Sequence, residues 1–321
     1  MLKCTRIMDS ISVIIPAHNA GATIVRAVRS AQQQRLRARE IIVVDDGSAD
    51  DTGRLARDAG ARVLRHSQPQ GAAAARDDGI RTASSPCVAL LDADDAFLED
   101  HLAANAALMT DPSVVLTFSR ALELREDGSK RLPPVDSDAD LRRPLWALAW
   151  RNLVPTSGSV LRVAAYVQSE GFDRTLIGAW AEDYDLWLRL ARLGPFACTG
   201  AVGVHRFVTN SSASRRQDAL ERMLQNGLYA VHKTAPHVVT QAPWLPRIAT
   251  AHIRREAARR FLASGLASRA REESAKAIRT NPADAAAWEL WALSHAPPQV
   301  VGVLQLLNAR VQDVRARFTA V

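Results

Sequence analysis

The sequence predicts an α/β fold with a mostly parallel central sheet, and two observations support this prediction. Over residues 11–109, short continuous apolar runs alternate with segments of helical spacing, an order typical of parallel strands joined by crossover helices. Beyond Arg215 the strand signals largely vanish, and the spacing of apolar residues favours helices. A chain of 321 residues is long enough for one large domain and a smaller one.

Each element in the first part of the chain has its own start or stop signal. The apolar run that begins at Ile11 is expected to end at Pro16, and the helix that begins at Asp51 is expected to end at Gly60. The expected strands are residues 11–15, 40–44, 61–64 and 87–91, and the expected helices are residues 22–33, 51–60, 71–84 and 97–109.

The middle of the chain mixes strand and helix signals. Strands are expected at residues 114–119, 121–125 and 157–161, and helices at residues 163–169 and 182–193. The last of these helices has Leu186 and Leu190 on one face, which predicts a core stripe. Trp146 and Trp150 are four residues apart on a further apolar segment, residues 145–153, and are expected in the core.

The last third of the chain is expected to be helical. The predicted helices are residues 217–231, 248–264, 266–279 and 283–294, of which the last two resemble one tetratricopeptide-like hairpin. Trp288 and Trp291 are three residues apart and are expected to form the core of that hairpin.

The net charge of +7 is unevenly distributed. Residues 1–214 hold 25 basic and 26 acidic side chains, whereas residues 215–321 hold 16 and 8. We therefore expect two domains, a catalytic one over 1–214 and a basic helical one over 215–321. Such a basic surface suits an acidic acceptor or peripheral contact with an anionic membrane, although solvated helix faces rich in arginine are the slightly favoured explanation. Without a reading helix or an aromatic platform, nucleic acid is not an expected partner.

Cysteine usage and apolar patterning indicate the compartment. The three cysteines form no C-x-x-C motif, which argues against a zinc site or a disulfide framework and fits a reducing cytosol. The first ten residues lack the apolar core of a signal peptide, and no apolar run approaches the roughly 20 residues of a membrane span. The expected localisation is cytoplasmic, with peripheral contact at the inner face of the cytoplasmic membrane as a further hypothesis.

An acidic cluster follows the fourth expected strand. Asp92 and Asp94 are two residues apart, so they would share one face if the strand continued. Ligands bind at such strand ends in open α/β sheets, and hard carboxylate oxygens suit Mg²⁺ or Mn²⁺, which in turn hold phosphates. The alternative is that Asp94 or Asp95 caps a helix that starts near Phe97.

Four other segments strengthen the metal interpretation. Pro16-Ala17-His18-Asn19 follows the first expected strand and Asp45-Asp46-Gly47-Ser48 the second, so polar groups gather at one sheet edge. A helix opened by Gln70-Gly71 carries Arg76, which can pair with phosphate. Another opens with Glu182-Asp183, where the helix dipole favours an acid.

The order and spacing of these segments resemble the inverting family 2 glycosyltransferases with the GT-A fold. The resemblance covers about residues 11–210 and rests on SVIIPAHN, EIIVVDDGSADDT, QGAAAARDDGI, PCVALLDADD, GFD at 171–173 and AEDYDLWLRLARLG. It implies transfer of a sugar from a nucleotide-diphosphate donor, most often a UDP-sugar, to a hydroxyl of a glycan or lipid-linked acceptor with Mg²⁺ or Mn²⁺. Cell-surface glycan assembly is the expected setting.

The resemblance also implies residue roles. Asp183 would be the general base that deprotonates the acceptor, Asp94 the principal metal ligand, and Asp92 a ligand to the metal, the ribose or the sugar. Asp45 or Asp46 would contact the base, and Trp180 with Glu182 is a candidate acceptor contact. The donor-binding set would be Pro16, Ala17, Asn19, Asp45, Asp46, Arg76, Asp92 and Ala93.

Two departures from the family pattern leave questions open. Family members usually have Arg-Asn where this chain has Arg76-Asp77, which would weaken donor binding unless Asp77 turns away. The histidine that often completes the metal site would fall near Thr209, so His205 is a candidate ligand, with a strand histidine facing solvent or acceptor as the equal alternative.

Two other functions remain as alternatives. A nucleotidyltransferase would share the nucleotide-binding sheet and acidic metal ligands, but no Gly-rich loop with a lysine follows the first strand. A catalytically degenerate binding or interaction protein is suggested by Asp77 and by the uncertain role of His205, and the intact Asp92, Asp94 and Asp183 argue against it.

Overall fold

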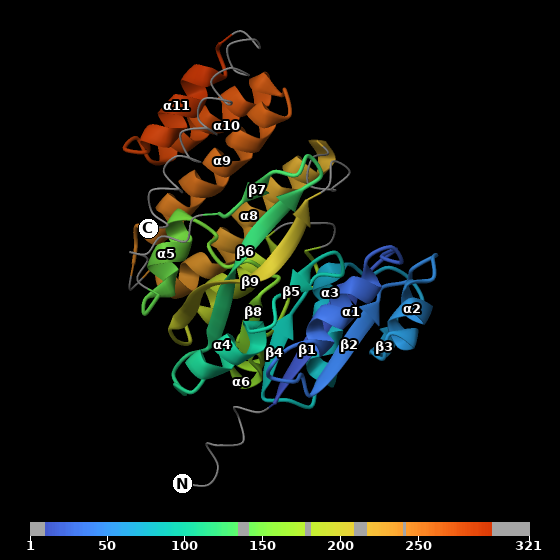
Figure 1. The fold of residues 1–321 in the computed structure, drawn as a ribbon. Coiled ribbons are helices and arrows are strands. Elements are labelled where there is room, and N and C mark those ends of the chain that lie inside the picture. The colour runs from blue at the N-terminus through green and yellow to red at the C-terminus, as the bar shows by residue number, and fades with distance from the viewer. Residues whose placement is uncertain (1–9, 134–140, 177–180, 209–216, 240–241, 297–321) are drawn as a thin grey trace. The chain divides into compact units, whose positions relative to one another are not determined.

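The computed structural model describes residues 10–133, 141–176, 181–208, 217–239 and 242–296 (Figure 1). The chain forms two compact units, one of residues 1–148 and 152–212 and the other of residues 149–151 and 213–321. Among the described residues, no helix is both long enough and apolar enough to cross a membrane.

The first unit is built on one sheet with the strand order β3-β2-β1-β4-β8-β6-β9-β5. Its first half is parallel and consists of β3 (Arg62–Arg65), β2 (Glu40–Asp45), β1 (Ile11–Ala17) and β4 (Cys87–Leu90). These strands are the four that the apolar runs predict, and the α/β class is confirmed. Their carboxyl ends lie along one edge of the sheet, because the strands run in the same direction.

The second half of the sheet is mixed. Strand β8 (Ser159–Arg162) is antiparallel to β4 and to β6 (Leu116–Arg125), whereas β6 is parallel to β9 (Phe196–Val208). The short strands β5 (Ala96–Phe97) and β7 (Lys130–Arg131) pair with β9 and β6. The two strands expected at 114–119 and 121–125 are one strand, whose register with β9 shifts between Phe118 and Ala121.

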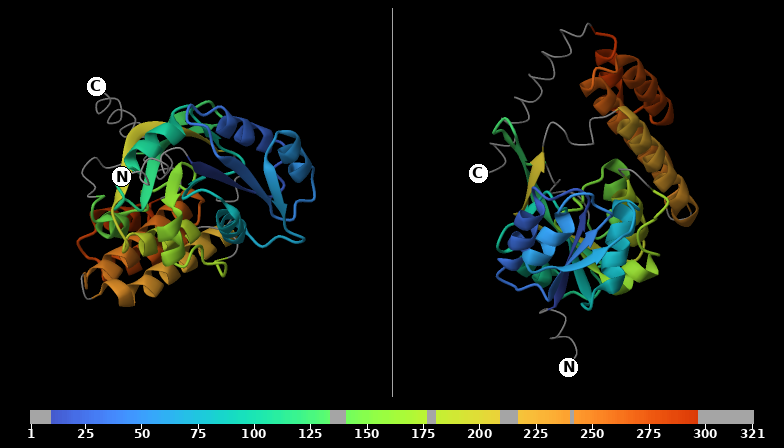
Figure 2. Two further views of the ribbon diagram at one scale, coloured as in Figure 1. Left: turned by 90° about the horizontal axis from the view of Figure 1, so that it is seen from below. Right: turned by 90° about the vertical axis from the view of Figure 1, so that its right-hand side faces the viewer.

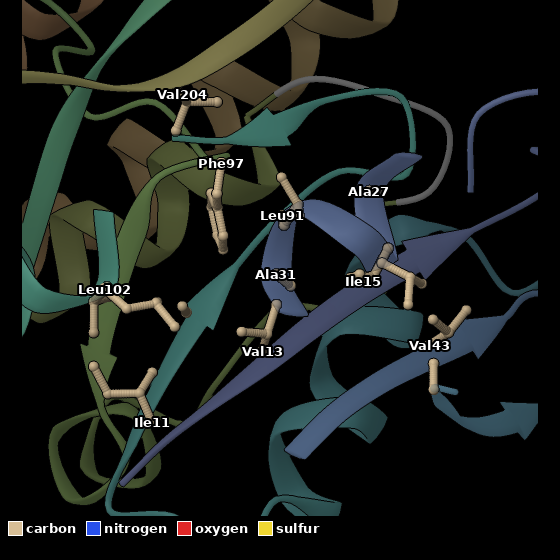
Figure 3. Packing of buried hydrophobic residues seen from close by; sticks show 14 of the residues in the cluster. Ile11, Val13, Ile15, Ala27, Ala31, Val43, Leu91, Phe97, Leu102 and Val204 are labelled. Atoms are coloured by element: carbon tan, nitrogen blue, oxygen red, sulfur yellow. The ribbon is translucent and has the colours of Figure 1, made fainter. Parts of the chain in front are cut away.

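Helices cover the parallel half on both faces. Figure 3 shows Val13 and Ile15 of β1 beside Ala27 and Ala31 of α1, and these side chains are fully buried. Because side chains alternate along a strand, Ile14 points to the other face, where it meets α3. The helices of this half are α1 (Ile24–Gln32), α2 (Thr52–Asp58) and α3 (Ala72–Thr82), whereas α4 (His101–Leu108) packs mainly on β9 and β6.

Two boundary predictions are wrong for identifiable reasons. Strand β1 continues through Pro16 to Ala17. Proline cannot donate an N–H, but the backbone nitrogen of Pro16 faces β4, and the pairing of β1 with β4 has already ended at Leu90, so no sheet hydrogen bond is lost. The helix expected from Phe97 begins at His101 instead, since Ala96 and Phe97 pair with β9. Asp100 is the residue that precedes this helix, so neither Asp94 nor Asp95 caps it.

The remaining helices of this part are α5 (Pro144–Trp150), α6 (Val163–Gln168) and α7 (Glu182–Leu190). Leu186 and Leu190 are fully buried, as the predicted stripe requires. Trp187 is also fully buried, and Asp185 forms a buried ion pair with Arg189 one turn later. Helix α7 is therefore embedded on several sides, which fixes the direction of its first turn.

Among its described residues, the second unit contains four complete helices, drawn in yellow to red in Figure 2: α8 (Gln217–Val238), α9 (Leu245–Ala263), α10 (Ala267–Thr280) and α11 (Ala285–Leu293). Its core includes Leu220 and Leu224 of α8 against Phe261 of α9 and Ala270 of α10. Helices occupy this region as predicted.

The predicted burial of two tryptophan pairs is wrong. Trp146 and Trp150 of α5 are 46% and 49% exposed, and Trp288 and Trp291 of α11 are 48% and 37% exposed. In α11 the core position is filled by the small Ala287, and the indoles lie against each other with ring centroids 6.2 Å apart. Spacing along a helix identified a shared face but not which face was buried.

Helix α3 packs so closely on the sheet that its glycine is required. A Cβ at Gly79 would lie 2.5 Å from Ile14 Cγ2 and 3.1 Å from Val44 Cγ2. We expect Gly79→Ala to lower the free energy of unfolding by about 1–3 kcal/mol, because overpacking outweighs the gain in helix propensity. Chemical denaturation followed by circular dichroism measures this.

The matched control for Gly79→Ala is Ala72→Gly at the exposed first position of the same helix. This change loses helix propensity without touching the sheet and should cost no more than about 1 kcal/mol. A Gly79→Ala protein as stable as the wild type would contradict the close approach of α3.

Candidate active site

An acidic turn lies at the carboxyl edge of the sheet, directly after β4. The strand ends at Leu90, and the N–H of Asp95 donates to the carbonyl of Asp92 across 3.0 Å. The chain therefore turns at this point, and Asp92 and Asp94 do not share one face of a continuing strand. Asp94 is exposed, Asp92 is half-buried and Asp95 is fully buried.

Arg76 joins this turn to the start of α7. From the middle of α3, its guanidinium donates to Asp92 Oδ1 at 2.7 Å and to Glu182 Oε1 at 2.9 Å. The arginine side chain is only 6% exposed. Burial alone would lower its pKa, but the charges of Asp92 and Glu182 outweigh that effect and raise it. Arg76 is thus a permanent cation that holds two distant segments together.

Asp183, next to Glu182, has a defined orientation and a shifted pKa. Its Oδ2 accepts from the Thr156 hydroxyl at 2.9 Å, and its Oδ1 accepts from the Tyr184 N–H at 2.6 Å. Burial, together with the charge of Glu182, raises the pKa of Asp183 to about 6. The residue before this pair, Ala181, has φ +97°, an unfavourable conformation for a side chain with a Cβ. A carboxylate with this pKa can accept a proton near neutral pH.

The loop before β8 contributes two side chains that the sequence did not reveal as site residues. Thr156 contacts Asp183, and the hydroxyl of Ser157 accepts the N–H of Asp92 at 3.0 Å. Ser157 was expected only as the first residue of a strand. Small hydroxyl residues before a strand are too common to identify a site without the fold.

The carboxylates of the acidic turn are incompletely neutralised. Burial and the charges of Asp92 and Asp94 raise the pKa of Asp95 to about 7. The pKa of Asp94 is also raised, first by desolvation and then by Asp92. A divalent cation would relieve this repulsion, so the exposed Asp94 and its neighbour Asp92 fit a metal. Within the ranges that the structure describes, no three His, Cys, Asp or Glu side chains are grouped as a ready-made metal site.

The loops after β1 and β2 hold each other at the same edge. Asn19, with φ +49°, donates its N–H to the Ser48 hydroxyl at 3.0 Å, and its side-chain oxygen accepts the Ala49 N–H at 2.9 Å. The carbonyl of Ala17, which follows Pro16 in β1, accepts the Asp46 N–H at 2.8 Å. The expected nucleotide-binding backbone is therefore a braced pair of loops.

Asp45 and Asp46 are both buried and face different partners. Asp45 forms an ion pair with Arg65 and accepts the Ser48 N–H at 3.1 Å. Asp46 accepts the N–H groups of Gln70 and Gly71, each at 2.8 Å, and contacts His66 at 2.7 Å. Asp46 thereby ties the end of β2 to the start of the helix that carries Arg76. These contacts do not single out either residue as the one that binds a base.

The carboxylate of Asp77 points away from Arg76. It accepts hydrogen bonds from the Tyr166 hydroxyl at 2.6 Å, Arg174 Nε at 2.8 Å and Arg81 Nε at 2.9 Å. Burial by itself would raise the pKa of Asp77, but these hydrogen bonds outweigh burial and lower it. The expected conflict between a carboxylate at this position and a diphosphate does not arise, because the charge is used inside the fold.

The other expected site residues occupy varied positions. Ala93 is buried in the core cluster of the first unit. His205 is half-buried in β9 and pairs with Ala96, just beyond the acidic turn, so it lies on a strand as one of its two interpretations assumed. Trp180 lies outside the described residues. Tyr184 is buried and donates its hydroxyl to the Leu148 carbonyl at 2.8 Å.

Comparison with known sequences identifies one family. Residues 12–152 match the model described as Glycosyl transferase family 2. A succinoglycan biosynthesis protein, ExoU of Rhizobium meliloti, is 42% identical over 97 residues, which are 29% of this chain and 28% of that protein. The pre-mycofactocin glycosyltransferase of Mycobacterium tuberculosis is 31% identical over 192 residues, 57% of this chain and 39% of that protein. The chain thus spans well under half the length of these two relatives.

Solved structures share the fold. The mannosyltransferase PcManGT of Pyrobaculum calidifontis, in complex with GDP-Man and Mn²⁺, superposes with a TM-score of 0.60 at 21% identity and covers 95% of this chain and 86% of its own. Staphylococcus aureus TarS gives a TM-score of 0.58 at 15% identity over 89% of this chain and 54% of its own. These structures share the expected GT-A architecture, and the matched residues 12–152, which include the donor-side motifs, are similar to the family 2 glycosyltransferases.

Proposed function

We propose that the chain is an inverting, metal-dependent glycosyltransferase that moves a sugar from a nucleotide-diphosphate donor to an acceptor hydroxyl in glycan biosynthesis. The observation that supports this best is the pair of ion contacts from Arg76 to Asp92 and Glu182. These contacts bring the acidic turn, whose carboxylates suit a metal, close to Asp183, the proposed base that follows Glu182. Residues 1–214 would be the catalytic domain and residues 215–321 a basic helical one.

On the donor side, Asp94 with Asp92 would hold Mg²⁺ or Mn²⁺. Magnesium sites of this kind use one or two carboxylates and complete their shell with substrate phosphates and water. The bound metal would stabilise the charge of the departing nucleotide diphosphate as a Lewis acid. Asp45 or Asp46 would contact the base, while the backbone of Pro16, Ala17 and Asn19 would line the nucleotide. Ala93, between the two ligands, would approach the donor through its backbone.

On the acceptor side, Asp183 would take the proton from the attacking hydroxyl. Its carboxylate is fixed by Thr156 and Tyr184, and its raised pKa suits a base that works near neutral pH. A single base facing the sugar opposite the leaving group predicts inversion at the anomeric carbon. Glu182, held by Arg76, and Trp180 are the proposed acceptor contacts, and His205 remains a candidate third metal ligand.

The substrates are proposed by analogy. Among the similar structures, TarS has been solved with UDP-GlcNAc and PcManGT with GDP-Man and Mn²⁺. A similar Escherichia coli enzyme is named as a glucosyltransferase that uses UDP-Glc and a diphosphoundecaprenol acceptor. We therefore propose a UDP-sugar donor and a glycan or lipid-linked acceptor, met at the cytoplasmic face of the membrane.

Metal-dependent donor binding tests the donor side. The wild-type chain should show a raised unfolding temperature with one of UDP, GDP or dTDP only when Mn²⁺ or Mg²⁺ is present. Asp94→Asn should lose this effect, because the principal metal ligand is gone. Differential scanning fluorimetry provides the measurement, with Asp100→Asn, an exposed carboxylate near the turn, as the control that keeps the effect. Stabilisation that is independent of metal would refute the metal assignment.

Loss of turnover with retained binding tests the base. Asp183→Asn should reduce kcat by about 100-fold or more, because general base catalysis is removed, while the affinity for nucleotide and metal changes little. Donor turnover assayed by nucleotide release, alongside calorimetric binding, separates the two. Asp58→Asn, an exposed carboxylate on α2, should match the wild type. Unchanged turnover in Asp183→Asn would exclude it as the base.

The pH profile follows from the shifted pKa. Since Asp183 must be ionised to accept a proton and its pKa is raised to about 6, kcat/KM should be high above pH 6 and fall as the pH drops through it. Below that point a single essential base predicts a decline of about tenfold per pH unit. Initial rates from pH 5 to 8.5 in overlapping buffers measure this. An acid limb near pH 4, the ordinary range of an aspartate, would contradict the buried geometry.

A further inference from the structure

The loop that enters β8 touches two catalytic segments with consecutive residues. The Thr156 hydroxyl donates to Asp183 Oδ2 at 2.9 Å, and the Ser157 hydroxyl accepts the N–H of Asp92 at 3.0 Å. Ser157 also forms a hydrogen bond with the carboxylate of Asp95. Asp92 and Asp183 are 91 positions apart in the sequence, yet the two residues that contact them, Ser157 and Thr156, are neighbours in the chain.

The loop is itself rigidly held. Gly158 donates its N–H to the carbonyl of Leu90, the last residue of β4, and accepts the Ser119 N–H of β6, both at 3.1 Å. Its φ of +99° is in the region that favours glycine, and a Cβ there would lie 2.7 Å from Val204 Cγ2. The Thr156 carbonyl accepts the hydroxyl of Ser159 at 2.9 Å. Thr156 and Ser157 therefore project from a backbone anchored to two strands.

We propose that Thr156 and Ser157 are positioning residues of the transfer reaction: the Thr156 hydroxyl orients the base Asp183, and the Ser157 hydroxyl fixes the turn that carries Asp92 and Asp94. The proposal rests on the function proposed above. Neither hydroxyl reacts. Their shared loop sets the separation between the site of the leaving diphosphate and the site of proton removal, which displacement chemistry requires to be constant.

The surroundings of Asp183 make the Thr156 hydroxyl consequential. The charged groups near its carboxylate are Glu182 on the same helix, which opposes ionisation, and Arg76 on α3, which favours it. Arg76 is already shared between Asp92 and Glu182. The Thr156 hydroxyl therefore supplies a neutral donor that stabilises the ionised form without competing for that arginine.

The first test is a direct titration of Asp183. Its carboxyl carbon can be followed by NMR in protein labelled with ¹³C-aspartate, with Asp183→Asn identifying the signal. Thr156→Val removes the hydroxyl and keeps the branched shape, so the titration midpoint should rise by about half a pH unit or more. Thr156→Ser should restore the wild-type midpoint. The acid limb of kcat/KM should shift by the same amount.

The second test separates Ser157 from Thr156. Ser157→Ala should weaken the binding of UDP with Mn²⁺ by about fivefold in calorimetry, because the acidic turn loses its support, while the Asp183 midpoint stays unchanged. Thr117→Val makes the same change as Thr156→Val at a buried threonine of β6 whose hydroxyl has no hydrogen-bond partner among the described residues, and it should leave both measurements as in the wild type.

Different results would refute different claims. A Thr156→Val midpoint equal to that of the wild type, or a Thr117→Val shift as large as that of Thr156→Val, would overturn the positioning role of Thr156. Unchanged nucleotide binding in Ser157→Ala would overturn that of Ser157. A wild-type chain that binds no nucleotide with metal and turns over no donor would refute the proposed function, while the titration of Asp183 would still decide the role of Thr156.

Discussion

The buried ion contacts of Arg76 are the constraint on which the site depends. One guanidinium neutralises a carboxylate from the acidic turn and another from the start of α7. Removing one partner from a buried ion pair typically costs about 3–5 kcal/mol of stability, so the position of each of these three groups depends on the other two. To deliver this arginine, α3 must lie close to the sheet, which explains its run of buried alanines at 73–75 and the glycine at 79. The arrangement of the candidate site is thus a consequence of how tightly one helix packs.

Environment gives chemically identical carboxylates different properties. Asp77 has a lowered pKa, because three donors surround it, whereas burial near other acids raises the pKa of Asp95 and Asp183. Asp92 accepts a hydrogen bond from Arg76. In the proposed reaction, a divalent cation would bind ionised carboxylates of the acidic turn on one side of Arg76. On the other side, the ionised carboxylate of Asp183 would accept the proton of the acceptor. The pKa differences among these aspartates therefore come from their surroundings, above all from the presence or absence of hydrogen-bond donors, and not from residue type.

The sequence predicted those parts of the fold that local patterns determine. Continuous apolar runs revealed the four parallel strands, and the periodicity of α7 revealed its buried stripe. Strand β5 was missed because two residues become a strand only through pairing with the distant β9. The outward position of Trp288 was missed because periodicity does not say which face of a helix meets a neighbour. Motif order likewise indicated Asp94 and Asp183, but Thr156 and Ser157 became visible only when the fold brought remote segments together.

The hydrogen bonds of Asp77 have a consequence for attempts to make this chain resemble the family 2 glycosyltransferases more closely. Asparagine is the usual residue after the arginine of this motif, so a consensus design would replace Asp77 with it. The amide has no charge to offer Arg81 and Arg174, and its NH₂ group is a donor that would face other donors. In this chain the consensus residue would therefore remove the carboxylate that Arg81 and Arg174 share, and Arg174 would keep its ion pair with Asp78. Positions 77, 81 and 174 are thus coupled through one carboxylate, and a design that changes Asp77 must also reconsider the two arginines.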